Sequence, residues 1–222
     1  MEQQIKYYAL QPKPIGIGHY GTVYEAFDSL KEQTVAIKKI RAYDGEKEAF
    51  ILKEAGKGNG FLPIFHDFFV IDEYGYVVME LLDGKKLGAG FHDKIKQWDE
   101  KKAVQTAINI LTGISSIHEL GYIHNDIMPK NIMVKEYRPE LTKVYDFNRA
   151  KEIRNEGMVL KDLRNTAEVC FVMLNGMLPK VLTGADLENK ELESVLLKAI
   201  KPTDENKYHS TKEFIDALRP FS

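Results

Sequence analysis

Hydrophobic and polar residues follow two different patterns along the chain. Up to about residue 82, short runs rich in Val, Ile, Tyr and Phe are separated by turn-forming stretches such as DSLKEQ and DEYG. Runs of this length and composition between turn signals predict the strands of an antiparallel sheet. A single helical stretch at about 44–55 is expected to interrupt that sheet.

From about residue 99 the apolar residues recur at helical spacing. Val104, Ile108 and Leu111 lie on one face of a predicted helix that follows a possible N-cap at Asp99 and stops at Gly121. Further helices are expected at about 160–175, 187–200 and 210–218.

A connector joins the two patterns. The glycines and lysines of residues 81–90, LLDGKKLGAG, suit an exposed linking segment. The predicted fold class is therefore α+β. We expect one domain over residues 1–222, with a small antiparallel β lobe carrying one helix (1–82) and a mainly helical lobe that includes the connector (83–222).

Composition and charge narrow the functional classes. The 222 residues include 31 Lys and Arg against 33 Asp and Glu, and 44% are hydrophobic, so a sizeable core is expected. The net charge of −2 argues against nucleic acid or a membrane surface as the main partner. Cys170 is the single cysteine, which excludes an internal disulfide. No signal peptide or membrane-spanning run is recognised, so a cytoplasmic location is expected.

Gly16, Gly18 and Gly21 form a GxGxxG pattern. Such a pattern is often a plain turn, and dinucleotide binding is an alternative. A dinucleotide-binding fingerprint needs a helix directly after the glycines, whereas the TVYEAF run that follows has strand composition. Glycines between two strands instead let backbone N–H groups approach phosphate oxygens. Lys38, in the AIKK run that begins at Ala36, could reach the same phosphates.

A second group of polar residues lies in YIHNDIMPKNIMV (122–134) and VYDFN (144–148). Asp126 and Asn131 are five positions apart in a loop, and Asp146 lies beyond a short predicted strand. Phosphoryl transfer needs a carboxylate that orients the attacking hydroxyl and two oxygen ligands for the metal that bridges the phosphates. A turn rich in Asn and Asp is the alternative, but the order of all these motifs favours phosphoryl transfer.

With these motifs in this order, the chain resembles the eukaryotic-type protein kinases over nearly its whole length. The resemblance implies a bilobal kinase-like fold, ATP and Mg²⁺ as cofactors, and transfer of the γ-phosphate to Ser or Thr of a protein. It also implies that Asp126 orients the acceptor hydroxyl, while Asn131 and Asp146 bind the metal.

The resemblance also assigns the nucleotide-binding residues. Lys38 would hold the α- and β-phosphates and pair with Glu48, for which Glu46 and Glu54 are competitors. The other assigned positions are the glycines Gly16, Gly18 and Gly21, the adenine contacts Val23, Ala36 and Met133, Met79 at the back of the adenine pocket, and the backbone of Glu80 and Leu82.

The chain departs from the kinase pattern in its catalytic and activation loops. Met128 stands where a lysine usually steadies the γ-phosphate, so either Lys130 reaches across, or the rate is reduced, or the acceptor is unusual. Asn125 replaces the arginine that typically holds a phosphorylated loop. That loop is short, and residues 147–161 contain no Ser, Thr or Tyr. We therefore expect activity without loop phosphorylation.

The shortened activation loop also lacks a further segment. In the protein kinases that the chain resembles, that segment supports an extended peptide substrate. A protein substrate recognised as a folded surface is therefore expected. Minimal kinases of this kind resemble bacterial effectors and viral kinases, for which the host cytosol is the expected location. Residues 150–156, AKEIRNE, are similar to a helix in the ATPase lobe of the large heat-shock chaperone Hsp90. This similarity suggests a host chaperone as partner. A small-molecule phosphotransferase of the aminoglycoside or choline-kinase type and a nucleotide-binding pseudokinase scaffold are the alternative functions.

Overall fold

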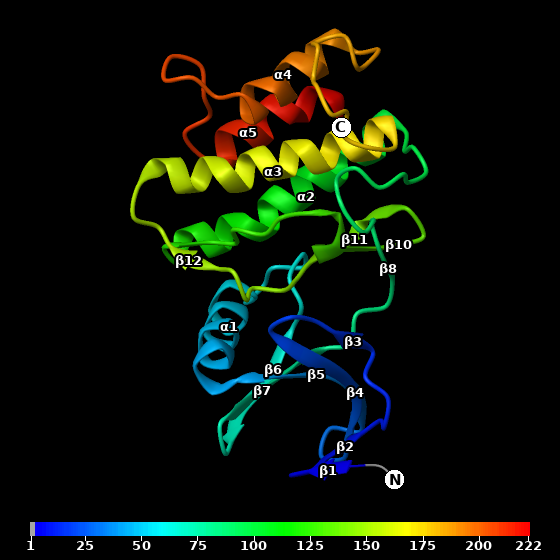
Figure 1. Ribbon diagram of the computed structural model, residues 1–222, viewed down its shortest axis with the longest axis vertical. Helices are drawn as coiled ribbons and strands as arrows, with labels where there is room; N and C mark the ends of the chain where they lie inside the picture. Colours follow the sequence, from blue (N-terminus) through cyan, green and yellow to red (C-terminus); the bar gives the residue numbers. More distant parts are fainter. Residues whose placement is uncertain (1–2) are drawn as a thin grey trace. The chain divides into compact units, whose positions relative to one another are not determined.

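The computed structural model describes residues 3–222, and its contacts divide the chain into two units, Met1–Asp83 and Gly84–Ser222. Figure 1 shows the elements of both units along the chain. The predicted α+β class is confirmed, because the first unit is built on a sheet and the second mainly on helices. Among the described residues, no helix has both the length and the apolar content needed to cross a bilayer.

The first unit is an antiparallel sheet with one helix. Its elements are β1 (Gln3–Ile5), β2 (Tyr8–Leu10), β3 (Gly16–Ile17), β4 (Gly21–Asp28), β5 (Gln33–Arg41), α1 (Ala42–Ala55), β6 (Phe65–Ile71) and β7 (Tyr74–Glu80). The strands are ordered β1-β2-β4-β5-β7-β6, and β3 pairs with β4. The strands and the helix that the sequence pattern predicts here are confirmed.

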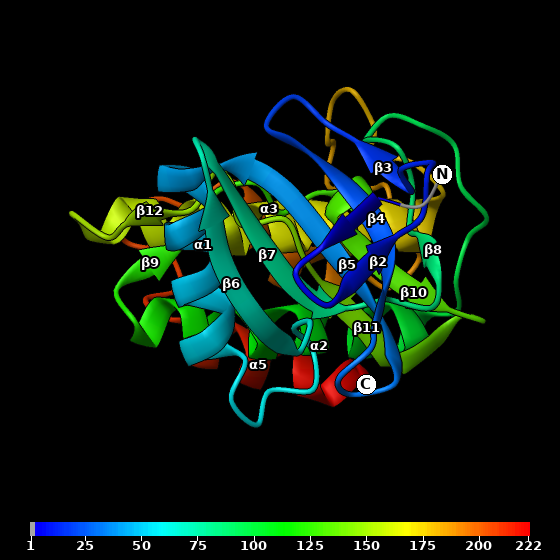
Figure 2. The same cartoon turned by 90° about the horizontal axis from the view of Figure 1, so that it is seen from below.

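Helix α1 packs against β7, β6 and β5, as Figure 2 shows from below. Its buried residues Glu48, Ile51, Leu52 and Ala55 recur at helical spacing and form the face toward the sheet. Because α1 covers one face and an apolar cluster around Tyr8 the other, β5 is buried on both sides along most of its length.

The second unit is mainly helical. Its elements are β8 (Lys85–Lys86), α2 (Glu100–Glu119), β9 (Tyr122–Ile123), β10 (Ile132–Lys135), β11 (Arg138–Val144), β12 (Lys151–Glu152), α3 (Glu156–Asn175), α4 (Lys190–Ile200) and α5 (Thr211–Leu218), with short 3₁₀ turns at Pro129–Asn131 and Arg219–Phe221. Helices α2 and α3 lie side by side in Figure 1 and are in contact.

The ends of helix α2 were predicted from local chemistry, and they are confirmed. The side chain of Asp99 accepts a hydrogen bond of 3.0 Å from the backbone N–H of Lys102, which caps the first turn. The chain leaves the helix at Gly121, whose φ of +82° favours glycine. All the later helices that the pattern predicts are also present.

The short strands were missed. Residues 81–90 are not only an exposed connector, because Lys85–Lys86 form β8 on β10 and Leu87 is buried. Strands β9 and β12 likewise pair with each other. A strand of two residues has too few positions for an alternating pattern, and its partner lies elsewhere in the sequence.

Candidate active site

The glycine-rich turn lies between β3 and β4. The backbone N–H of Gly18 donates to the carbonyl of Gly21 at 2.9 Å, which closes the turn. A side chain at position 21 would collide with the carbonyl oxygen of Lys39, so the pairing of β4 with β5 requires glycine there. At Gly16 and Gly18 a Cβ would meet no heavy atom closer than 3.7 Å. These two positions leave the backbone open to the approach of a phosphate.

The neighbouring strands bring four of the assigned nucleotide-binding residues onto one face of the sheet. Val23 on β4 lies opposite Lys38 on β5, and Ala36 on β5 lies opposite Met79 on β7. Residues directly opposite in antiparallel strands share a face, and so do residues two apart along one strand. A cationic side chain and three apolar side chains are thus grouped in the first unit.

Lys38 forms an ion pair with Glu48 of helix α1. Its Nζ lies 2.9 Å from Oε1 and 2.8 Å from Oε2 of that carboxylate. Both side chains are buried, at 8% and 1% exposure. Of the competing glutamates, Glu46 is exposed and Glu54 pairs with Lys57. Removing two opposite charges from water is costly, and this close bidentate geometry offsets much of that cost.

At the end of β7, the backbone N–H of Glu80 donates to the carbonyl of Ile64 at 2.8 Å. The carboxylate of Glu80 accepts in return from the N–H of Ile64 at 3.1 Å. The backbone N–H of Glu80 is therefore already hydrogen-bonded within the first unit. The adenine contacts assigned to this stretch would be made by the backbone carbonyl of Glu80 and by the backbone of Leu82, which lies next to the last residue of the unit.

In the second unit, a buried carboxylate of helix α3 holds the loop around Asp126. Asp162 accepts from the backbone N–H of His124 at 2.7 Å and from that of Asn125 at 2.8 Å. The Nε2 of His118 lies 2.9 Å from the same carboxylate. These three contacts to one buried carboxylate fix the backbone of the residues that directly follow β9.

Asp126 and Asn131 are joined directly. The side-chain Nδ2 of Asn131 donates to the backbone carbonyl of Asp126 at 2.8 Å and to its carboxylate at 2.9 Å. Asn131 is buried in the 3₁₀ turn Pro129–Asn131. Because the amide nitrogen makes both bonds, Oδ1 is the atom of Asn131 that can ligate a cation.

Asp146 is held in an uncommon backbone conformation. It has a φ of +72°, and Asn125 has one of +65°. Such left-handed conformations cost a non-glycine residue about 1–2 kcal/mol and often mark functional positions. Asn148 donates a hydrogen bond from Nδ2 to the carboxylate of Asp146.

His124 and Phe147 pack together beneath this loop. Both are fully buried, and their ring centroids are 5.1 Å apart. Burial lowers the pKa of His124 against the opposing effects of Asp162 and the other nearby carboxylates. The Nε2 of His124 lies 3.2 Å from the carbonyl of Tyr145. A neutral histidine that packs and orients, rather than a metal ligand, fits these surroundings.

The donor set suits Mg²⁺ together with a nucleotide phosphate. Asn131 Oδ1 and the Asp146 carboxylate are hard oxygen donors, and Mg²⁺ is commonly bound by one or two carboxylates plus substrate phosphates. Within residues 3–222, no three His, Cys, Asp or Glu side chains cluster in a way that could hold a metal without such help. Asn131 and Asp146 are the residues that would hold the ion.

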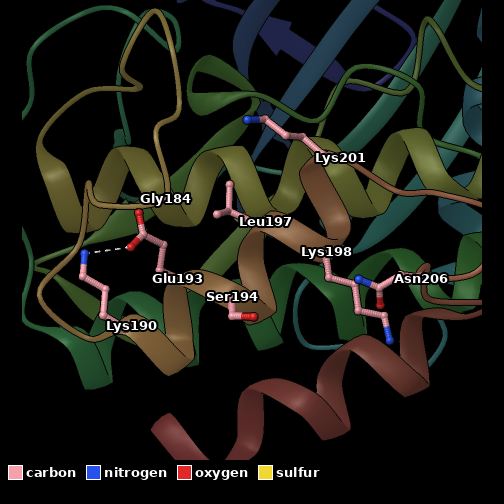
Figure 3. A pocket seen from close by; sticks show the side chains of 8 residues that line it. All are labelled: Gly184, Lys190, Glu193, Ser194, Leu197, Lys198, Lys201 and Asn206. Atoms are coloured by element: carbon pink, nitrogen blue, oxygen red, sulfur yellow. Dashed lines mark hydrogen bonds and ion pairs between the residues drawn. The ribbon is translucent and has the colours of Figure 1, made fainter.

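A separate cavity of about 330 Å³ lies in the second unit beside α4 (Figure 3). Its lysines are directed to different internal partners. Lys190 pairs with Glu193 at 3.0 Å, Lys201 donates to the carbonyl of Leu182 at 2.9 Å, and Lys198 lies over the ring of Tyr208. Since these ammonium groups do not converge, the cavity lacks the geometry of a phosphate site.

Comparison with known proteins agrees with this geometry. The family described as "Protein kinase domain" matches residues 10–170, which include the glycine-rich turn, the Lys38–Glu48 pair and the loop around Asp126. The chain belongs to the protein kinase family.

Kinases of several organisms are similar to the chain. The mitogen-activated protein kinase mpkC of Neosartorya fischeri is 34% identical over 151 residues, which cover 64% of this chain and 38% of that protein. Serine/threonine-protein kinase D of Synechocystis is 26% identical over 204 residues, covering 85% of this chain and 39% of that protein. This kinase chain thus spans less than two fifths of the length of these relatives.

A kinase structure shares the fold. The crystal structure of Rad53 1-466 in complex with AMP-PNP matches with a TM-score of 0.74, covering 96% of this chain and 65% of that one. The sequence identity is 20%, so this likeness shows the fold. The kinase-like fold that the resemblance implied is confirmed.

Each unit of the kinase contains part of the assigned site. The first unit carries Gly16, Gly18, Gly21, Val23, Ala36, Lys38, Glu48, Met79, Glu80 and Leu82, and the second carries Asp126, Asn131, Met133 and Asp146. Sequence reasoning gave no role to Arg149 or Lys161, which contact the loop around Asp126. The unusual residue at position 125 was the signal that could have led to them.

Proposed function

We propose that the chain is an ATP- and Mg²⁺-dependent protein kinase that phosphorylates Ser or Thr of a protein substrate. The observation that carries the proposal is the Asp126–Asn131 bond, in a loop that Asp162 holds and close in sequence to Asp146. It is supported by the buried Lys38–Glu48 pair in the first unit. The relatives named serine/threonine-protein kinases support the choice of hydroxyl.

In this proposal the Asp126 carboxylate accepts a hydrogen bond from the acceptor hydroxyl and receives its proton during transfer. Asn131 keeps that carboxylate in place through its Nδ2 bond. Lys38, positioned by Glu48, binds the α- and β-phosphates. A bound Mg²⁺, held by Asn131 and Asp146, would neutralise phosphate charge.

The kinase would work without phosphorylation of its activation loop. Residues 147–161 offer no hydroxyl. The loop is instead held by protein contacts, since Asn125 Nδ2 donates to the carbonyl of Arg149 at 2.9 Å and β12 pairs with β9. These bonds take the place of a phosphate that would order the segment.

The proposed substrate is a folded protein surface rather than a short peptide, because helix α3 begins at Glu156, only a few residues after β12. That leaves little chain to support an extended peptide. The segment 150–156, whose similarity to a chaperone helix suggested a host chaperone as partner, is not helical at Lys151–Glu152, which form strand β12.

Incubation of the protein with γ-labelled ATP, Mg²⁺ and a cell lysate tests the proposal beside an Asp126→Ala control. Labelled protein bands that disappear in the control are the expected result. Labelled small metabolites would favour a small-molecule phosphotransferase. ATP binding without transfer would favour a pseudokinase scaffold.

A further inference from the structure

A cationic side chain lies next to the proposed catalytic carboxylate. Nη1 of Arg149 is 3.6 Å from Oδ1 of Asp126, and both residues belong to the second unit. The Arg149 side chain is 55% exposed and that of Asp126 is 16% exposed. This pair is therefore open to solvent, unlike the buried Lys38–Glu48 pair.

The backbone of Arg149 is anchored by Asn125. Its carbonyl accepts from Asn125 Nδ2 at 2.9 Å. The amide oxygen of Asn125 accepts from Lys161 Nζ at 2.6 Å, and its backbone N–H is bound to Asp162 at 2.8 Å. Asn125 itself has a left-handed backbone, with a φ of +65°. Arg149 is thus held at its main chain, while its guanidinium reaches Asp126.

The guanidinium keeps most of its hydrogen-bonding capacity. Arginine presents five N–H donors in a planar fork that matches phosphate oxygens. Among residues 3–222 its one ion pair is that to Asp126. A phosphoryl group that approaches Asp126 would meet the remaining donors.

Lys130 is the other cation near this carboxylate in the sequence, but no contact of its side chain with Asp126 is present among residues 3–222. It is exposed and makes no hydrogen bond or ion pair within the part of the chain that the structure describes. Its backbone carbonyl accepts from the Tyr145 hydroxyl at 2.6 Å. Arg149 is therefore the better placed of the two cations.

We infer that Arg149 is a catalytic residue that stabilises the transferring phosphoryl group, with Asn125 and Lys161 as its positioning residues. This role rests on the proposed kinase function. In the transfer, a bond forms between the acceptor oxygen and the γ-phosphorus, and the bond from that phosphorus to the β,γ-bridging oxygen breaks. The hydroxyl proton goes to Asp126, and the electron pair of the broken bond leaves with ADP. Arg149 stabilises the charge spread over the γ-phosphoryl oxygens.

The test compares Arg149→Ala with Arg154→Ala, a control in the same segment whose exposed side chain makes no hydrogen bond or ion pair among the described residues. Turnover of Arg149→Ala should fall about 10²–10³-fold with ADP affinity unchanged within about twofold, because the interaction forms in the transition state. Arg149→Lys should retain part of the rate. Millimolar guanidinium should partly restore Arg149→Ala, which a loss of folding would not allow.

A binding measurement separates this role from the kinase proposal itself. Affinity for Mg²⁺, ADP and fluoroaluminate, which together mimic the transferring phosphoryl, should fall at least about tenfold in Arg149→Ala and stay unchanged in Arg154→Ala. Asn125→Gly, which tolerates the left-handed backbone, should show a smaller loss. Equal fluoroaluminate affinity in wild type and Arg149→Ala, or faster turnover of the variant, would overturn the inference alone. A wild-type protein that binds no ADP would refute the kinase function and this role together.

Discussion

The buried ion pair between Lys38 and Glu48 predicts a specific pattern of stabilities. Glu48→Leu removes the carboxylate that accepts hydrogen bonds from Lys38 at 2.9 and 2.8 Å. Breaking a buried pair from one side typically costs about 3–5 kcal/mol, because a charge remains in a poorly solvated place. Replacing both partners by apolar side chains of similar size is often nearly neutral. Lys38→Met combined with Glu48→Leu should therefore be more stable than Glu48→Leu alone by at least about 2 kcal/mol.

Urea unfolding followed by far-UV circular dichroism measures these differences. The matched control is Glu54→Leu on the same helix, whose pair with Lys57 is largely exposed, and its midpoint should hardly move. The double variant should stay folded yet lose affinity for ATP, which separates the structural role of the pair from its proposed function. If Glu48→Leu destabilises no more than Glu54→Leu, or if the two buried substitutions simply add, the reasoning is wrong.

Three further predictions concern the two units. Asp162→Asn places an amide where a carboxylate accepts hydrogen bonds from three donors. It should lower the free energy of unfolding of the second unit by about 2–4 kcal/mol, and the fluorescence of Trp98 during urea unfolding measures this loss. Gly21→Ala introduces a methyl group against the carbonyl of Lys39 and should cost about 1–3 kcal/mol and weaken ATP binding, which calorimetry would detect. Burial lowers the native pKa of His124, while the unfolded chain protonates it near 6.5. At pH values below 6.5 the free energy of unfolding should therefore decrease by up to about 1.4 kcal/mol per pH unit, until the native pKa is reached. A His124→Asn variant should lose less stability between pH 7.5 and 5.5.

Elements with their own local signals could be predicted from the sequence. Helix α2 has a capping aspartate, a helical period and a terminal glycine, and each of these acts within a few residues. The strands β4 to β7 are long enough to show their composition. The pairs β8–β10 and β9–β12 could not be found in this way, because they depend on contacts between distant segments.

The candidate site likewise contains residues that local motifs predict and contacts that only the folded structure shows. Motif order predicted Lys38, Asp126, Asn131 and Asp146 as site residues. The resemblance favoured Glu48 as the partner of Lys38, with Glu46 and Glu54 as competitors. Burial on the inner face of α1 selects Glu48. The contact of Arg149 with Asp126 links positions in two irregular loops, where no periodicity exists to be read.

The central claim is that the protein binds Mg²⁺-ATP and that Lys38 and Asp146 are each needed for this binding. The affinity for Mg²⁺-ATP, measured by calorimetry in wild type, Lys38→Met and Asp146→Asn, tests it most directly. We predict binding by the wild type and at least about a tenfold loss in each variant, because in the proposed function Lys38 binds the phosphates and Asp146 ligates the metal. Wild-type affinity in either variant would contradict the claim.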